Sequence, residues 1–131
     1  MRVTTGAAGN ARLGIYQVPV GGVVDYTLSP LLLDSGALSV AATPSDAEAT
    51  IAIFLDPGWY ILACVSDVAP SVNGYFANIS SAPLGWASLA DQTRGSAFYR
   101  SFTYAALPDP FGGTLTYIMT TMPAVRLRVL S

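Results

Sequence analysis

The apolar residues of this sequence recur with a period of two, and Gly or Pro interrupts the pattern at short intervals. No stretch of eleven or more residues keeps the 3.6-residue apolar period of an amphipathic helix without a Gly or Pro. Successive side chains of a strand point to opposite faces, so a period of two indicates strands that bury one face. The pattern therefore predicts an all-β chain.

Several segments carry this strand pattern, and they are residues 11–17, 38–41, 50–55, 59–65, 98–104, 114–119 and 125–129. The segment 125–129, in which Val and Leu alternate with Arg, has the clearest pattern of a half-buried strand. The segment 59–65 is apolar on both parities, which predicts a central strand covered on both faces. Trp59 and Tyr60 at its start are expected to lie in the core.

Gly and Pro mark the connections between these segments. In Asp56-Pro57-Gly58, Pro stands where φ is preset and Gly where φ must be positive, which predicts a type II turn. Glycine pairs or Asn-Gly at 21–22, 73–74 and 112–113 predict further positive φ angles. About eight strands at this spacing predict an antiparallel β-sandwich of jelly-roll or Greek-key topology, with residues 1–131 as a single domain.

Charged residues make up only 11% of the sequence and apolar residues 52%. The net charge of −2, with six arginines and no lysine, gives no sign of binding to nucleic acid. The longest strongly apolar run is far below the ~20 residues that span a bilayer, so membrane insertion is not expected. The N-terminal residues lack the apolar core of a signal peptide. Large exposed apolar areas are rare on monomers, so the shortage of charge predicts self-association, with a homotrimer favoured.

The residues that usually carry catalysis are scarce. The absence of histidine removes the commonest general base and most zinc sites. Cys64 lies in an apolar strand without a visible base, which predicts a buried, unreactive thiol. Among the eight carboxylates only Asp46 and Glu48 are close in sequence, and no calcium-loop motif is present, although a calcium site built from carboxylates and backbone carbonyls stays open. We therefore predict no catalytic residue, no cofactor and no metal ligand.

Aromatic and polar side chains concentrate in the loop-rich part of the chain, residues 74–104. Sugars are recognised by flat aromatic faces and by fixed polar groups that contact hydroxyls. The candidate ligand-binding residues are Tyr75, Trp86, Asp91, Gln92, Arg94 and Tyr99. Two alternatives stay open: the aromatics fill the end of the sandwich, and Arg94 is a solvated loop charge.

Four runs of the sequence resemble a known family, and they are ARLGIY at 11–16, LLLDSG at 31–36, PGWYILA at 57–63 and PAVRLR at 123–128. They are similar to a β-sandwich domain of tailed-bacteriophage fibres and related virion proteins. The similarity covers roughly residues 2–67 and 105–130. Its motifs are structural, so the resemblance implies a fold and a place in a virion and no activity. In that family residues 12–16 would form an early strand and Trp59 would be a packing residue.

The resemblance implies a trimeric virion appendage that contacts a host surface glycan or protein together with other virion proteins. A head fibre or capsid-decoration protein is the alternative, and a carbohydrate-active enzyme is a third hypothesis that the lack of histidine disfavours. The family usually has a strand before the one that matches residues 2–5. We therefore expect either that an upstream portion is missing, which is favoured, or that a partner chain fills an open edge there.

Overall fold

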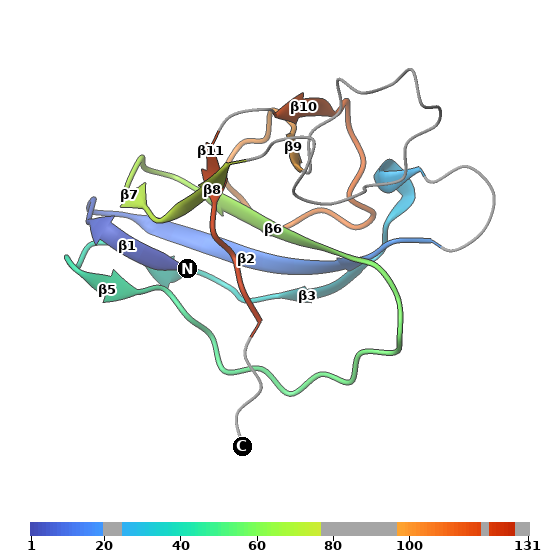
Figure 1. The fold of residues 1–131 in the computed structure, drawn as a ribbon, viewed down its shortest axis with the longest axis horizontal. Helices are drawn as coiled ribbons and strands as arrows, with labels where there is room; N and C mark the ends of the chain where they lie inside the picture. Colours follow the sequence, from blue (N-terminus) through green and yellow to red (C-terminus); the bar gives the residue numbers. More distant parts are fainter. Residues whose placement is uncertain (20–24, 77–96, 119–120, 128–131) are drawn as a thin grey trace.

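The computed structural model describes residues 1–19, 25–76, 97–118 and 121–127 (Figure 1). The described residues form eleven strands in four antiparallel sheets, with one short 3₁₀ helix at Tyr26–Leu28 and no α-helix. The predicted all-β, antiparallel class is confirmed. The division into strands is finer than the predicted eight, because several strands pair over only two or three residues. The jelly-roll or Greek-key order stays a prediction.

The longest strand, β2 (Asn10–Gln17), lies at the centre of the main sheet. It pairs antiparallel with β6 (Tyr60–Ser66) along one side. Its other side pairs with β3 (Leu31–Asp34) and β4 (Leu38–Ser39). The alternation of residues 11–17 therefore predicted this strand correctly, and Figure 1 shows β2 and β6 crossing the molecule together.

The expectation that residues 59–65 form the central strand was wrong. Within the described residues β6 pairs with β2 alone, so β2 holds the central place. Trp59 precedes the strand and is 62% exposed, which corrects its expected place in the core. A strand with apolar side chains on both parities is expected to be buried on both faces. A strand at the edge of a sheet can also be buried on both faces, so the pattern did not determine the position of this strand in the sheet.

A second sheet covers one face of the main sheet. Its strands are β5 (Ser45–Asp46), β1 (Arg2–Thr5) and β7 (Ser71–Val72), with β1 in the middle. The buried side chains of Val3, Ala11, Val40 and Ala47 form one core cluster between these sheets. Because β1 is paired on both sides, it is not the open edge that was expected for a partner chain to fill.

The opposite face of the main sheet carries a second core cluster. Tyr16 packs there with Leu107 and Phe111, and half-buried side chains of β6 surround them. This side of the molecule also holds the pair β9 (Ala97–Tyr99) and β10 (Thr116–Ile118) (Figure 1). A further pair joins β8 (Gly74–Phe76) to β11 (Thr121–Pro123). The main sheet is thus buried on both faces, as in a sandwich.

One predicted strand and the described part of another form no ladder. Residues 50–55, and residues 125–127 of the predicted strand 125–129, lie outside all eleven strands of the described chain, and residues 128 and 129 lie outside the described residues. In 50–55 the side chains nevertheless alternate between exposed and half-buried. The apolar period predicts which face of a segment is buried. Whether its backbone pairs with another strand depends on residues distant in the sequence.

The predicted turns were correct in part. Gly112 and Gly113 have φ angles of 59° and 76°, as expected from the glycine pair. Gly58 has no positive φ, so the predicted type II turn at 56–58 was wrong, and Gly74 lies in β8 without a positive φ. The pair at 21–22 lies outside the described residues.

Candidate functional site

The structure places only part of the predicted glycan-binding face. Trp86, Asp91, Gln92 and Arg94 lie outside the described residues. Tyr75 belongs to β8 and is opposite Met122 in the ladder, and its side chain is likewise outside the description. Tyr99 stands on β9 opposite Thr116, and its side chain is 53% exposed. The predicted face is therefore represented by a single placed side chain, and its composition stays a prediction.

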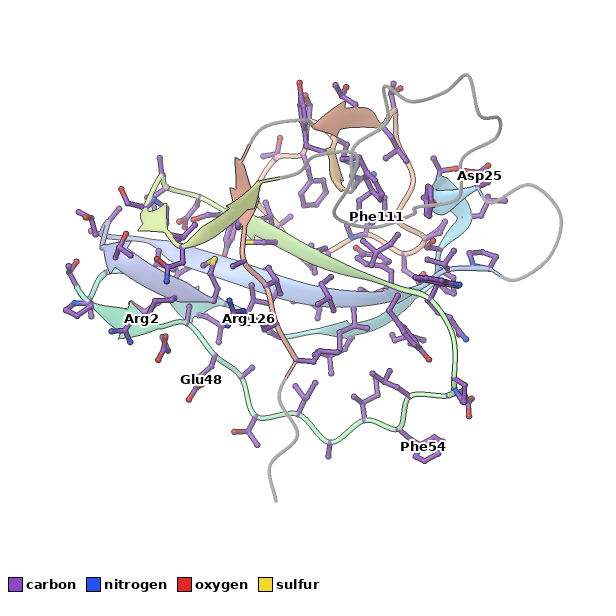
Figure 2. The ribbon with its side chains drawn as sticks, in the orientation of Figure 1. Arg2, Asp25, Glu48, Phe54, Phe111 and Arg126 are labelled. Atoms are coloured by element: carbon purple, nitrogen blue, oxygen red, sulfur yellow. The ribbon has the colours of Figure 1, made fainter. Side chains whose placement is uncertain are left out.

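Beneath Tyr99 lies a cluster of packed aromatic rings. Phe98 points to the other side of β9 and meets Phe111 edge to face, with ring centroids 5.6 Å apart at 89°. Phe111 in turn contacts Tyr16 at 4.9 Å and 80°, and Phe98 contacts Tyr26 at 5.3 Å. Edge-to-face pairs of this kind add to the stabilisation from burial alone. The cluster packs against β9 and so holds the strand that carries the exposed Tyr99 (Figure 2, where Phe111 is labelled).

Arg100 follows β9 and lies against this cluster. Its guanidinium carbon is 4.8 Å from the ring centre of Phe102 and 5.4 Å from that of Phe111. The Gly112-Gly113 turn leaves room for it, because a Cβ on Gly113 would lie 2.9 Å from the Arg100 Nη1. Within the described residues the guanidinium makes no hydrogen bond or ion pair, so its N–H donors are available to an anionic or carbonyl oxygen.

Arg100 was not among the predicted residues. In the sequence it is one arginine of the alternating segment 98–104, and the side chains of Phe98, Arg100, Phe102 and Tyr104 are all half-buried while those between them are exposed. The predicted alternation of buried and exposed side chains in 98–104 is therefore correct. The signal that could have singled out Arg100 is a charged residue on the buried parity of a segment in a chain with little charge.

Tyr16 contributes structure rather than proton transfer. Burial raises the pKa of Tyr16 to about 12, although the nearby charge of Arg100 acts in the opposite direction. Its hydroxyl donates a hydrogen bond of 2.9 Å to the carbonyl oxygen of Pro108. A hydroxyl with this pKa stays protonated near neutral pH and fixes the segment around residue 108 to the main sheet.

An ion pair joins β2 to β3 on the same face. Arg12 Nη1 lies 2.8 Å from Asp34 Oδ2, and both side chains are largely buried. Asp34 also accepts hydrogen bonds of 2.9 Å from the backbone N–H groups of Leu107 and Gly36. Burial raises the pKa of Asp34, but these hydrogen bonds and the charge of Arg12 outweigh it, and the pKa is lowered. Both carboxylate oxygens of Asp34 accept hydrogen bonds, so the residue has a structural role.

Cys64 is half-buried on the face of β6 that packs against the N-terminus. Its thiol lies 3.7 Å from the sulfur of Met1. Burial raises the pKa of the Cys64 thiol, with the positive N-terminal amine acting against it. The thiolate, which is the reactive form, is therefore disfavoured at neutral pH, and the expected low reactivity stays a prediction.

Carboxylates do not gather into a metal site in the part of the chain that the structure describes. Asp46 lies 3.1 Å from Arg2 in an exposed ion pair, so the carboxylate has a cationic neighbour from β1 that the sequence did not reveal. The helical residues described here include no segment long and apolar enough to cross a membrane.

A small apolar groove lies on the face of the main sheet opposite to the Arg12–Asp34 ion pair. Leu13, Ile15 and Leu62 form its floor, and the extended segments near Ile51 and Val125 form its walls. Its volume is about 60 Å³. Neither wall segment belongs to a strand of the described chain.

No family model, curated protein or solved structure matches this chain.

Proposed function

We propose that this chain is a structural protein of a bacteriophage particle, of the fibre or receptor-binding type, which assembles as a homotrimer. In this proposal it adheres to a glycan or protein on the host surface without catalysing a reaction. It works as a virion appendage beside other virion proteins. The sequence resemblance implies that the chain is part of a virion, and the exposed apolar side chains of the folded chain support its self-association.

The observation that carries the proposal is the set of large apolar side chains that the single chain leaves exposed. In the described residues these are Leu28, Leu32, Phe54, Trp59, Tyr99 and Leu127. Only 11% of the sequence is charged, so few charged side chains share the surface with them. Large exposed apolar areas are rare on monomers, which supports a homo-oligomer, and the trimer that the sequence resemblance implies is a closed assembly of this kind.

The buried core of the single chain is small. Eleven apolar residues are buried in the described part of a sequence whose apolar content is 52%. Large apolar side chains such as Phe54 and Trp59 are instead exposed at 88% and 62%. Exposed apolar area of this kind favours association with another protein surface.

Adhesion is supported by two residues that follow one another in the chain: Tyr99, whose ring is exposed, and Arg100, whose half-buried guanidinium makes no hydrogen bond or ion pair within the described residues. An aromatic face and a planar donor group are the side chains that contact the C–H patches and the acidic groups of a sugar. Three copies of one weak site on a common surface gain affinity by multivalency, by a factor of about 10² or more.

The proposal is tested with fluorescently labelled protein and a panel of bacterial strains. The expected result is saturable retention on at least one strain, displaced by unlabelled protein. A Tyr99→Ala/Arg100→Gln double variant that keeps the oligomeric mass should be retained at least about tenfold less well. Equal retention of the double variant would remove these two residues from the binding site, and no retention on any strain would contradict adhesion.

A further inference from the structure

We propose that Arg100 anchors a binding site for a carboxylate carried by a sugar, as in a uronic acid unit of a surface glycan. The inference rests on the proposed adhesion and names the chemical class of its ligand. In this site the guanidinium of Arg100 donates parallel hydrogen bonds to the carboxylate, and the groups packed around Arg100 hold its side chain in position.

The Arg100 side chain is held by two rings and by a glycine turn. Its guanidinium carbon lies 4.8 Å from the ring centre of Phe102 and 5.4 Å from that of Phe111. A Cβ built on Gly113 would lie 2.9 Å from Arg100 Nη1 and 3.1 Å from its Cδ, so the backbone of this glycine lies close against the side chain. A side chain that is fixed before its ligand arrives loses less conformational entropy on binding.

The guanidinium of Arg100 is packed but not enclosed. Arg100 is half-buried, and its guanidinium has no hydrogen-bond partner within the described residues. Three fully enclosed polar atoms of the described side chains also lack a partner, and none of them belongs to Arg100. The unpaired nitrogens of Arg100 are therefore open to solvent, and a ligand can reach them.

Arg100 differs in this respect from two other arginines of the described chain. Arg2 Nη1 lies 3.1 Å from Asp46 Oδ2, and Arg12 Nη1 lies 2.8 Å from Asp34 Oδ2. Arg100 has no such carboxylate within the described residues. Because the rings beside it displace part of its water, the attraction of this cation for an anion is stronger than that of a fully solvated arginine.

The arrangement favours a sugar carboxylate over other anions. The planar guanidinium presents N–H groups that match the two oxygens of a carboxylate. Arg100 supplies one positive charge, which balances one carboxylate, whereas a phosphate monoester carries a charge of about −1.5 to −2 at neutral pH. The ring of Phe102 beside the guanidinium is only half-buried, which leaves apolar surface for the C–H face of a sugar ring.

NMR of the arginine side chains tests the site on the full chain labelled with nitrogen-15. The protein is titrated at constant ionic strength with sodium glucuronate and with glucuronamide, which has the same ring and a neutral amide. The Arg100 Nε–H signal, identified by its absence in Arg100→Gln, should shift saturably with glucuronate. The affinity for glucuronamide should be at least about tenfold lower, because the charged acceptor is lost. Glucose phosphate and glucose sulfate should also bind more weakly than glucuronate.

A first pair of variants separates the charge at the site from charge elsewhere, with glucuronate affinity measured by calorimetry. Arg100→Gln should lower the affinity at least about tenfold, since it removes hydrogen bonds to a charged group. Arg2→Gln is the matched control, because it removes the same charge from an exposed ion pair and should bind as the unaltered protein does.

A second pair separates the position of Arg100 from backbone strain. Gly113→Ala places a Cβ against Arg100 and should lower the glucuronate affinity about threefold or more, because the side chain is displaced. Gly36→Ala is the matched control: its φ of 72° is close to the 76° of Gly113, and no atom lies within 4 Å of its Cβ. Equal losses of affinity in both variants would contradict the positioning of Arg100 by the turn.

The outcomes separate this inference from the proposed function. An Arg100 signal that does not move with glucuronate, or an affinity that Arg100→Gln leaves unchanged, overturns the site and leaves adhesion through other residues standing. Equal affinity for glucuronamide, or tighter binding of glucose phosphate or glucose sulfate, overturns the carboxylate as the ligand. A protein that binds glucuronate through Arg100 and is retained on no bacterial strain contradicts the proposed adhesion and leaves the site standing.

Discussion

Replacing Asp34 by Ala should destabilise the fold more than any other loss of a single described carboxylate. The substitution removes the ion pair to Arg12 at 2.8 Å and the acceptor of the Leu107 and Gly36 N–H groups at 2.9 Å. It also leaves the Arg12 guanidinium largely buried without its partner, and the Arg12 Nε already lacks one within the described residues.

The size of the effect follows from burial. The side chains of Arg12 and Asp34 are 22% and 18% exposed, so water replaces the lost contacts only in part. Breaking a fully buried pair costs about 3–5 kcal/mol. Partial exposure places the expected loss near the lower end, about 3 kcal/mol, which for a chain of this size lowers the melting temperature by about 10 °C.

The assay is thermal and urea unfolding followed by circular dichroism at pH 7, with all variants at one protein concentration because association shifts apparent stability. Asp56→Ala is the control: it removes the same charge from an exposed residue and should change stability by less than about 0.5 kcal/mol. If Asp34→Ala melts within about 1 °C of Asp56→Ala, the three contacts contribute nothing and the reasoning fails.

The same carboxyl predicts a pH dependence. The pKa of Asp34 is lower in the folded than in the unfolded chain. Its contribution to the free energy of unfolding is therefore fully present above the unfolded pKa and is lost as the pH falls through the folded pKa. The stability gap between the unaltered protein and Asp34→Asn should stay constant near neutral pH and narrow in acid. A gap that widens in acid would contradict the sign of the shift.

Three further predictions concern single side chains. Gly6→Ala should cost about 2 kcal/mol in urea unfolding, because its Cβ would meet a backbone oxygen at 2.2 Å, whereas Gly58→Ala, with no atom nearer than 3.9 Å, should be close to neutral. Cys64 should react with a thiol reagent far more slowly in the native than in the unfolded protein, and Cys64→Ala should cost about 1 kcal/mol and leave binding intact; fast native labelling would contradict this. Trp86→Ala and Arg94→Ala should each reduce adsorption to host cells with little change in melting temperature, and normal adsorption of both would place the binding face elsewhere.

The strand pattern could be read from the sequence where burial alone decides it. Residues 11–17 alternate cleanly, and they form the central strand β2 because both of its faces meet an apolar layer. The alternation of 50–55 was equally clear and predicted which side chains face inward. It could not predict whether a backbone partner exists, because pairing depends on segments distant in the chain.

The contacts of the candidate site were beyond sequence reasoning for a related reason. Asp34 and Leu107 are 73 residues apart, and no local pattern connects them. Arg100 gains its place from Phe111 and from the positive φ of Gly113, which the fold brings together. Trp59 shows the opposite error: its apolar character predicted burial, and residue type alone does not fix the exposure of a residue just outside a strand.

The central claim is that this chain does not stay monomeric, and its mass in solution tests that claim most directly. Sedimentation equilibrium of the purified chain at micromolar concentration should give three times 13.7 kDa, with dissociation on dilution. A single species of 13.7 kDa across the micromolar range would contradict the account, since the exposed side chains of Phe54 and Trp59 would then have no partner.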